Sequence, residues 1–459
     1  MPLDDPVRRH ARERPDALAL RADGRDLTYA ELDAEAERVA RGLAETGVGS
    51  GSRVVTSLRA GVEFAALLHA TPRLGAVLVP LAPDLPAPER DRLLEAAVAR
   101  PGVAEPVSGG EAGREPAPGA RLDPDTPHTL MFTSGTTGAP KPVELTYANH
   151  LASARASAAN LGVEAGDRWL CPLSVHHVGG LAILLRSAIY GTAAIAHERF
   201  ETEAVRRSLE SGEATLVSLV ATQLRRLAED GLESAPALRA ALLGGGPVPP
   251  DLLAWAAERG LPVLQTYGMT ETASQVATLS AAEALAAGGR GSAGRALHGV
   301  ELRIEGEERE VLVRGPMVSH GALAPDGWLH TGDRGALDPD GHLWIEGRLD
   351  DTVVTGGENV AVVEVEEALQ AHRAVVEAAV VGRPDPEWGQ AVVAYVVLDP
   401  ALAEPTDAEL VAHARERLAP HKAPKEIHRV TDLPRTESGK LIRARLRAPS
   451  PRVAPPAFG

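Results

Sequence analysis

The stretch best suited to chemistry runs from Thr133 to Lys141, in the order Thr-Ser-Gly-Thr-Thr-Gly-Ala-Pro-Lys. It follows an apolar run, residues 128–132, with the composition of a β-strand. Two glycines and four hydroxyl side chains offer N–H and O–H donors, and the lysine adds positive charge, so the segment could cradle a polyphosphate. It is not a Walker A loop, because prolines flank Lys141. A polar surface loop is the alternative, but the full order after a strand favours phosphate binding.

A second segment, Gln265 to Thr272, follows the apolar residues 262–264 and so begins where a strand is expected to end. Proteins of the α/β class place ligands at such strand ends. Tyr267 could stack on a nucleobase, and Glu271 offers hard oxygen ligands suited to Mg²⁺ between phosphates. The same letters could equally form the start of a helix with a capping threonine.

Two shorter motifs are weak when taken alone. Thr331-Gly332-Asp333 places a carboxylate after a tight turn, where it could accept hydrogen bonds from both ribose hydroxyls, although aspartate is common in turns. Lys440 ends a glycine-containing run that begins at Arg435 and could reach a bound anion. A lone lysine of this kind is most often a solvated surface residue.

The elements that must position these motifs alternate between strands and helices. Thr28 lies three residues before Glu31, as in a capping box, and opens a helical apolar pattern over residues 27–48. Short apolar runs predict buried strands at 53–57, 76–80, 216–220, 240–243 and 262–265. The alternation predicts α/β layering, and the Pro- and Gly-rich residues 101–121 predict a surface loop.

The pattern changes near residues 340–351, after the strong turn chemistry of Asp338-Pro339-Asp340-Gly341. The remaining residues predict helices at 363–372 and 407–418 and strands at 375–381 and 391–397. We therefore place a boundary at about 349/350, between a domain of residues 1–349 and one of residues 350–459.

Composition excludes several classes of protein. The chain of 459 residues has a net charge of −16, which argues against nucleic-acid binding because phosphate backbones need a basic face. Its one cysteine cannot form an internal disulfide. The charged N-terminus is not a signal peptide, and the longest apolar stretch, residues 64–83, is broken by polar residues and proline. We expect a soluble cytoplasmic protein without integral membrane association.

Taken in order, the four motifs resemble the superfamily of adenylate-forming enzymes, which comprises acyl-CoA synthetases, non-ribosomal peptide adenylation domains and beetle luciferases. The resemblance extends from Leu27 to Lys440. Shorter segments agree with it: Leu243–Pro247, Val313–Pro316, Gly347–Asp351, Gly382–Asp385 and Trp388–Gly389. It implies an α/β fold, with a large multi-subdomain N-terminal domain of sheets flanked by helices, a small mobile C-terminal α+β domain, and a hinge at Asp350.

The resemblance also implies the reaction. ATP would convert a small-molecule carboxylic acid into an acyl-adenylate with release of pyrophosphate, and the thiol of coenzyme A would then attack the adenylate. Mg²⁺ would accompany ATP at Glu271. Lys440 would bridge the carboxylate and the α-phosphate and then leave to admit the thiol, because two anions must approach at the α-phosphorus.

The remaining nucleotide contacts follow by the same resemblance. The β- and γ-phosphates would lie against Thr133, Ser134, Gly135, Thr136, Thr137, Gly138 and Lys141. The adenosine would contact Gly244, Gly245, Gly246, Tyr267, Gly268, Thr270, Asp333 and Arg348, of which the last two would bind the ribose.

The run from Tyr267 to Gln275, together with residues 278–280, 291–294 and 355–360, resembles the 2-succinylbenzoate–CoA ligases of menaquinone biosynthesis. The acyl pocket would include His177, Ser218, Gly268, Thr272 and Ser274, with His177 closing the site during adenylation. Small polar groups of this kind suit a dicarboxylate better than a long alkyl chain.

Two features of the acyl region have ordinary alternatives. The pair His176-His177 could be buried, hydrogen-bonded core histidines, since metal binding needs further partners. Arg225 or Arg226 could pair with a second carboxylate of the acid, although both are more simply read as surface helix residues.

Other functions stay open at this stage. The same chemistry could serve an aryl or fatty acid, could load a carrier protein instead of coenzyme A, or could be lost in a non-catalytic nucleotide-binding protein. A homodimer is also left open. NAD binding is rejected, because the Gly-rich letters at 289–294 follow a predicted helix and precede a strand-like segment, the reverse of the dinucleotide fingerprint.

Overall fold

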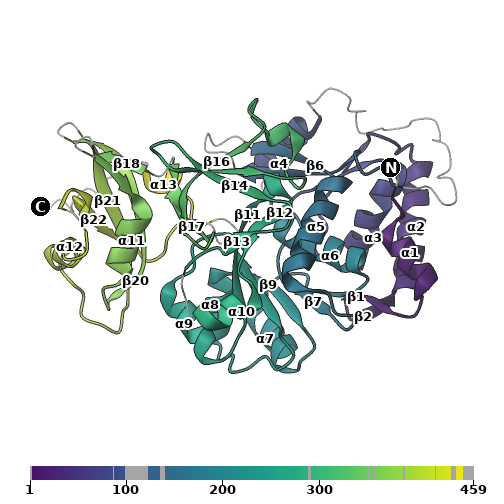
Figure 1. The fold of residues 1–459 in the computed structure, drawn as a ribbon, viewed down its shortest axis with the longest axis horizontal. Helices are drawn as coiled ribbons and strands as arrows, with labels where there is room; N and C mark the ends of the chain where they lie inside the picture. The colour runs from purple at the N-terminus through teal and green to yellow at the C-terminus, as the bar shows by residue number, and fades with distance from the viewer. Residues whose placement is uncertain are drawn as a thin grey trace, which may run out of the picture. The chain divides into compact units, whose positions relative to one another are not determined.

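The computed structural model describes residues 3–85, 87–98, 122–134, 140–287, 291–349, 352–355, 358–385, 388–418, 420–435 and 441–447. Mixed sheets flanked by helices run along the chain, which confirms the predicted α/β class (Figure 1). Two compact units can be distinguished. One comprises Met1–Arg303, Leu312–His330 and Leu337–Trp344, and the other Ile304–Val311, Thr331–Ala336 and Ile345–Gly459. The domain boundary at 349/350 stays a prediction.

The largest sheet has nine strands in the order β13-β12-β11-β10-β9-β7-β8-β1-β2. They are β1 (Leu18–Ala22), β2 (Arg25–Thr28), β7 (Arg168–Cys171), β8 (Ala193–Ala196), β9 (Leu216–Val220), β10 (Ala240–Gly244), β11 (Val263–Met269), β12 (Ser274–Thr278) and β13 (Arg295–Ala296). The strands from β11 to β1 are parallel, whereas β12, β13 and β2 pair antiparallel at the two edges. The predicted runs at 216–220, 240–243 and 262–265 are strands β9, β10 and β11, buried as central parallel strands require.

A second sheet has the order β3-β4-β5-β6. Its strands are β3 (Arg53–Thr56), β4 (Val77–Pro80), β5 (Pro127–Ser134) and β6 (Pro140–Thr146). The first three are parallel, and β6 pairs antiparallel with β5 from Pro127↔Thr146 to Ser134↔Pro140. The predicted phosphate loop therefore connects the two strands of a hairpin.

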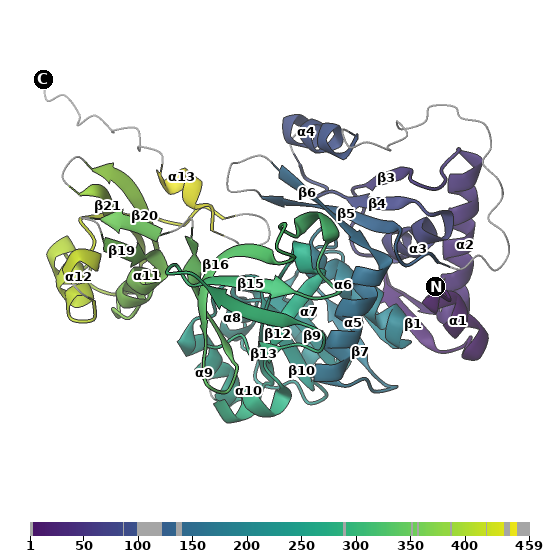
Figure 2. The ribbon, with the colours of Figure 1, turned by 45° about the horizontal axis from the view of Figure 1, so that its top comes forward.

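The helices of this unit are α1 (Pro6–Glu13), α2 (Tyr29–Glu45), α3 (Val62–Ala70), α4 (Ala87–Val98), α5 (Tyr147–Leu161), α6 (Val178–Tyr190), α7 (Thr202–Glu210), α8 (Ala221–Glu229), α9 (Pro250–Glu258) and α10 (Ala281–Ala287), with the 3₁₀ segments η1 (Thr71–Leu74), η2 (Thr270–Thr272) and η3 (His320–Ala322). The predicted capping box opens α2, where Glu31 N–H donates to Thr28 Oγ1 and Thr28 N–H donates to Glu31. Helices α5 and α6 pack against each other and against β12 (Figure 2).

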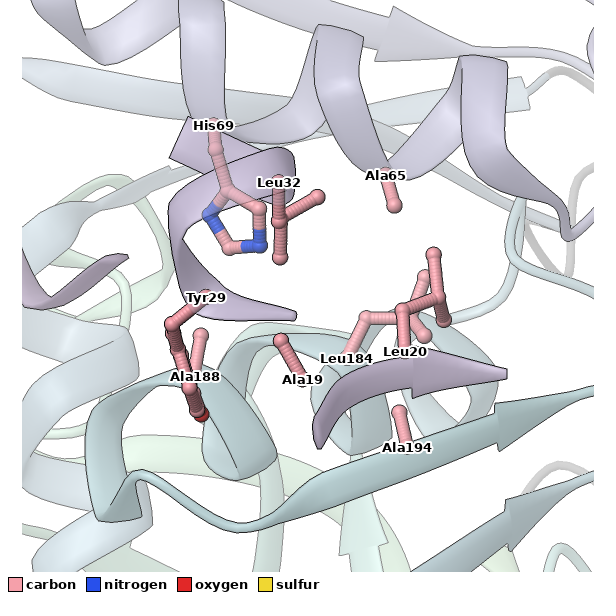
Figure 3. A pocket seen from close by; sticks show the side chains of 9 residues that line it. All are labelled: Ala19, Leu20, Tyr29, Leu32, Ala65, His69, Leu184, Ala188 and Ala194. Carbon is pink, nitrogen blue, oxygen red and sulfur yellow. The ribbon is translucent and has the colours of Figure 1, made fainter. Parts of the chain in front are cut away.

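A small cavity lies in the core between α2, α3, α6 and the edge of the large sheet (Figure 3). It is lined by Ala19, Leu20, Tyr29, Leu32, Ala65, His69, Leu184, Ala188 and Ala194. Burial lowers the pKa of His69 to about 3, so this imidazole is neutral at physiological pH. None of the predicted site residues lines this cavity.

A third sheet, β14-β15-β16-β17, is formed by Glu301–Glu305, Glu310–Arg314, Leu329–Leu337 and Leu343–Arg348. The sheet beyond it has the order β19-β18-β21-β20, with β22 beside β21. Its strands are β18 (Thr352–Thr355), β19 (Glu358–Ala361), β20 (Val375–Asp385), β21 (Gly389–Leu398) and β22 (Glu426–Arg429), and the helical segments are α11 (Val362–Gln370), α12 (Asp407–Arg415), η5 (Pro420–Lys422) and α13 (Arg443–Arg447). Both predicted helices and both predicted strands are present, whereas the hairpin β18–β19 was not predicted.

Candidate active site

Several predicted adenosine and acyl residues of the first unit lie at one edge of the nine-stranded sheet, whereas the described phosphate residues Thr133, Ser134 and Lys141 lie on β5 and β6 of the second sheet. Because β7, β9, β10 and β11 are parallel neighbours, their carboxyl ends meet there. Ser218 lies in β9 beside Leu242 of β10, and Gly244 ends β10 beside Val220. Tyr267 lies near the end of β11, half-buried. The sheet thus brings Ser218, the glycines 244–246 and Tyr267 onto adjoining strands.

Two glycines at this edge are required by close approach. A Cβ on Gly244 would lie 2.9 Å from Thr266 Cγ2 in the next strand. A Cβ on Gly268 would lie 1.8 Å from the carbonyl oxygen of Ser274, where β11 bulges against β12. A side chain at Gly268 would require the backbone of the turn to move, and one at Gly244 would require Thr266 to shift, so these glycines keep the strand ends close together.

The turn between β11 and β12 is strained. Ala273 has φ 49° and Ser274 has φ 105°, in the half of conformational space that side chains other than glycine avoid. Thr272 is fully buried and its hydroxyl lies 3.0 Å from the Met269 carbonyl and 2.8 Å from that of Ser274, while accepting from Met269 N–H at 3.1 Å. The buried Thr272 hydroxyl therefore stabilises the turn. This indicates that Thr272 shapes the pocket rather than contacting an acid directly.

Glu271 lies in η2 and is half-buried. Its carboxylate has no hydrogen-bond or ion-pair partner within the described ranges. Strand β6 of the predicted phosphate hairpin contacts η2, and Ser319 joins the two. The Ser319 N–H donates to the Glu271 carbonyl and its hydroxyl donates to the Glu144 carbonyl of β6, both at 2.7 Å. The fold thus places a half-buried carboxylate beside the strand that carries Lys141, whose side chain is exposed.

His177 caps α6 immediately after β7 and the loop that follows it. The residue is exposed at the surface, yet enough protein surrounds its ring that desolvation lowers its pKa. His176 is half-buried and His177 is exposed, with their rings 4.4 Å apart, so neither is a fully buried core histidine. A neutral imidazole at the sheet edge fits the predicted position beside the acyl site.

Asp333 and Arg348 belong to the second unit and lie together on β16 and β17. Arg348 Nη1 donates to Asp333 Oδ1 at 2.9 Å, and Asp333 is buried. Gly332 has φ 68°, its N–H donates to Glu310, and a Cβ there would lie 3.2 Å from the Arg348 guanidinium. The tight glycine turn expected from the sequence is therefore present and holds the carboxylate against the arginine.

Several predicted residues lie outside the described residues. They are Gly135, Thr136, Thr137 and Gly138 of the phosphate loop, the hinge Asp350, and Lys440. The residues flanking the Lys440 segment, Arg435 and Leu441, form an antiparallel bridge. Arg443, just beyond, donates to both oxygens of the buried Glu366, so the chain after Lys440 is tied to α11.

Sequence reasoning missed several positioning residues. Neither Ser319 nor Asn149 was singled out by a motif. Asn149 donates to the carbonyls of Pro316 and Val318, and Ser319 donates to that of Glu144. Each of these contacts spans more than 150 positions of sequence, so no local pattern could reveal it. Arg186 is different, because it is the one charged residue in the apolar run 178–190 and could have been noticed. Arg225 pairs with Asp251 at the surface, as its ordinary interpretation expects.

Comparison with family models identifies the chain. The model described as AMP-binding enzyme matches residues 7–108 and 100–323, and the model of the AMP-binding enzyme C-terminal domain matches residues 364–440. The chain belongs to the AMP-binding enzyme family. The predicted resemblance to adenylate-forming enzymes is thereby confirmed, as is the division into a large N-terminal and a small C-terminal part.

Individual relatives of this AMP-binding enzyme are similar over nearly their whole length. The 2-succinylbenzoate–CoA ligase of Bacillus licheniformis is 38% identical, with 97% of this chain and 100% of that protein aligned. The ligase of the same name from Bacillus subtilis is also 38% identical, with 94% and 95% aligned. The crystal structure of o-succinylbenzoate CoA synthetase from Bacillus subtilis with the acyl-adenylate intermediate superposes with a TM-score of 0.88, at 36% identity over 98% of this chain and 99% of that one. A structure of that synthetase with ATP and magnesium ion gives 0.87.

Proposed function

We propose that this AMP-binding enzyme joins 2-succinylbenzoate to coenzyme A, with ATP converted to AMP and pyrophosphate. The observation that carries the proposal is the likeness to 2-succinylbenzoate–CoA ligases over almost the entire length of both chains. The strand-end site supports it, because Ser218, Gly244 and Tyr267 lie on the adjoining strands β9, β10 and β11. The reaction class is that of an AMP-forming acid–thiol ligase.

The reaction has two steps. A carboxylate oxygen of the acid attacks the α-phosphorus of ATP, the bond from that phosphorus to the bridging oxygen breaks, and pyrophosphate leaves. The sulfur of coenzyme A then attacks the acyl carbon, and AMP leaves with the electrons of the broken acyl–oxygen bond. The first step brings two anions together, so a cation at the meeting point lowers its barrier. We assign that role to Lys440.

The site residues divide by the part of the nucleotide that they would hold. Gly244 packs closely against Thr266 of β11 and ends β10 at the sheet edge, where Tyr267 of β11 would stack on adenine. Asp333, positioned by its hydrogen bond from Arg348, would accept hydrogen bonds from ribose hydroxyls. The hairpin β5–β6 would contribute Thr133, Ser134 and Lys141 to the phosphates.

Magnesium fits Glu271. This carboxylate is half-buried, lies beside the phosphate hairpin and has no cationic partner among the described side chains, so a hard cation would meet an available oxygen ligand there. When bound, the ion would neutralise charge on the phosphates of ATP. The protein's own contribution is to fix the backbone of Glu271 beside β6, since Ser319 donates to the main-chain carbonyls of Glu271 and Glu144.

Three further statements are proposals from the sequence: that residues 350–459 swing about Asp350, that the protein works in the cytoplasm, and that it forms a homodimer. Among the described residues, no helix has both the length and the apolar character needed to cross a bilayer.

A panel of acids tests the function. Pyrophosphate release and thioester formation are measured with 2-succinylbenzoate, benzoate and octanoate, each with and without coenzyme A. We expect 2-succinylbenzoate to give the highest kcat/KM and a thioester only when coenzyme A is present. If benzoate or octanoate is preferred, the enzyme is an aryl- or fatty-acid–CoA ligase; pyrophosphate release that no acid stimulates would contradict the proposal altogether.

The variant Lys440→Ala tests the proposed role of Lys440 at the α-phosphate. Loss of one preorganised charge at the reacting phosphate should slow adenylate formation by about 10²- to 10³-fold while ATP binding changes little. Lys422→Ala is the matched control, because Lys422 is a lysine of the same unit that pairs with Glu364 and has no predicted role in the site. Normal adenylation by the Lys440 variant would show that another cation serves the α-phosphate.

A further inference from the structure

A short segment, residues 316–319, is bonded to the corner where strand β6 of the phosphate hairpin runs into helix α5. Asn149, in the first turn of α5, donates through its amide nitrogen to the carbonyls of Pro316 at 2.9 Å and Val318 at 3.1 Å. The amide oxygen of the same side chain accepts from the N–H and the hydroxyl of Thr146, both at 2.9 Å. The buried amide therefore caps the helix with its oxygen and holds the segment with its nitrogen.

Ser319, the last residue of this segment, joins the corner to η2. Its hydroxyl donates to the Glu144 carbonyl of β6, and its N–H donates to the Glu271 carbonyl of η2, both at 2.7 Å. The serine is 2% exposed, so water competes little for either hydrogen bond. Ser319 thus links the strand that carries Lys141 to the backbone of the residue proposed to bind magnesium.

The position of Glu271 depends on such outside bonds. Segment η2 has three residues, and the chain that follows it holds Ala273 at φ 49°. Short 3₁₀ segments have poor hydrogen-bond geometry of their own, so neighbouring elements must fix them. Ser319 does so at the Glu271 carbonyl, and Ser153 of α5 does so at the Ala273 carbonyl, to which its hydroxyl donates at 2.8 Å. Both bonds lead back to α5, one directly and one through Asn149.

The separation between η2 and β6 matters most for a nucleotide that carries magnesium. This ion needs oxygen ligands at about 2.0–2.1 Å in near-octahedral geometry, so a displaced carboxylate is a poor ligand. The phosphates that would share the ion are predicted to lie against Thr133, Ser134 and Lys141 of the β5–β6 hairpin. The carboxylate of Glu271 and these phosphates can bind one ion only if η2 and β6 keep the right separation. AMP lacks the β- and γ-phosphates and does not depend on it.

We propose that Ser319 is a positioning residue for the magnesium-bound triphosphate. By fixing Glu271 relative to the phosphate hairpin, its hydroxyl determines how strongly the enzyme distinguishes ATP with magnesium from AMP. Asn149 supports this role, because it holds the backbone of the residues just before Ser319. The inference rests on the proposed function, in which Glu271 receives the magnesium ion of ATP.

The test measures binding and not turnover. Dissociation constants of the whole chain for ATP and AMP are measured by titration calorimetry without any acid, each with and without Mg²⁺. The variants are Ser319→Ala, which removes the hydroxyl and keeps the N–H, and Ser319→Thr, which keeps both. Ser208→Ala is the matched control, because Ser208 is also a buried serine whose hydroxyl donates at 2.7 Å, in its case to Glu213.

We expect Ser319→Ala to weaken the binding of ATP with Mg²⁺ by about 3- to 10-fold, the size expected when one hydrogen bond is lost. Binding of AMP, and of ATP without Mg²⁺, should change little. Ser319→Thr should recover most of the affinity, and Ser208→Ala should leave all the constants unchanged. Equal weakening for ATP and AMP, or no weakening of either, would overturn the role of Ser319. Should Ser319→Ala not fold, Ser319→Cys decides, since a thiol is only a weak donor.

A double-mutant cycle with Glu271→Gln separates this inference from the proposed function. Glu271→Gln should remove most of the affinity that Mg²⁺ adds for ATP, and Ser319→Ala should then have little further effect, because both changes act on the same ligand. Additive losses would show that Ser319 does not act through Glu271. If Glu271→Gln keeps the full effect of Mg²⁺, the assignment of Glu271 and this inference both fail. A wild-type chain that binds neither nucleotide would instead refute the proposed function.

Discussion

The first unit contains two buried arginines, and the regions around them differ in whether nearby carboxylates compensate the positive charge. Arg73, in η1, lies 2.8 Å from Asp5, 2.5 Å from Asp33 and 3.3 Å from Glu37. Although desolvation alone would lower the pKa of Arg73, the carboxylates of Asp5 and Asp33 raise it. Arg186 has only neutral partners among the described residues, and desolvation lowers its pKa.

This difference distinguishes a region that serves packing, around Arg73, from one that serves function, around Arg186. Around Arg73 the chain supplies every counter-charge itself, from α1 and α2, so the region is complete before any ligand binds. Around Arg186 the charge is unbalanced, the adjoining turn holds two non-glycine residues at positive φ, and Glu271 has no described partner. Strain and unsatisfied charge of this kind persist where binding or catalysis needs them.

The largest expected effect is on stability in the compensated region. Arg73→Met should lower the free energy of unfolding by about 3–5 kcal/mol, because Asp5, Asp33 and Glu37 would stay close together without their cation. Urea unfolding measures the loss, and kcat/KM per folded molecule should change little. If Arg73→Met also changed which acid the enzyme prefers, the region around Arg73 would not differ in function from the region around Arg186.

A smaller but catalytic effect is expected at the strained turn. Gly268→Ala would place a Cβ 1.8 Å from the Ser274 carbonyl and so displace the turn, and a shift of about 1 Å at a reacting site costs about 10²-fold in rate. Adenylation kinetics measure it. Gly42→Ala in α2, where a Cβ meets nothing within 4 Å, is the control and should be silent. Full activity in the Gly268 variant would show that the turn is not part of the site.

The smallest expected effect is on how the free energy of unfolding depends on pH, and it concerns two buried histidines of the packed core. Burial lowers the pKa of His69 to about 3 and of His128 to about 4, below the ordinary value of about 6.5. The unfolded chain therefore binds protons between pH 6.5 and about 4 that the folded chain does not. Stability should be fully present above pH 6.5 and fall as the pH drops, by up to about 1.4 kcal/mol per pH unit for each histidine.

Urea midpoints between pH 5 and 8 test this, with His128→Gln as the comparison. The variant should show a shallower fall on acidification, since one of the titrating groups is gone. An identical slope in the variant and the wild type would mean that His128 does not resist protonation in the folded state.

Much of the fold followed from patterns that are local in sequence. The capping box at Thr28, the apolar runs of β9 to β11 and the helix α10 form where expected, because caps and periodicity act over one or two turns or strands. The hairpin β18–β19 was not predicted, because each of its strands is short and the pairing between them is not evident from the sequence pattern. Ser319 was missed because its two acceptors, Glu144 and Glu271, come from distant segments.

The sequence by itself indicated candidate residues for phosphate, ribose and metal, because those motifs are contiguous. The residues predicted to contact the acid came from the resemblance to a family, because they are scattered along the chain. Only the tertiary structure decided that Ser218, Gly244 and Tyr267 lie on adjoining strands, that Arg348 holds Asp333, and that Arg186 is buried with only neutral partners among the described residues. Burial and charge compensation depend on side chains brought together from far apart in the chain. No local pattern records which partners a buried charge will find.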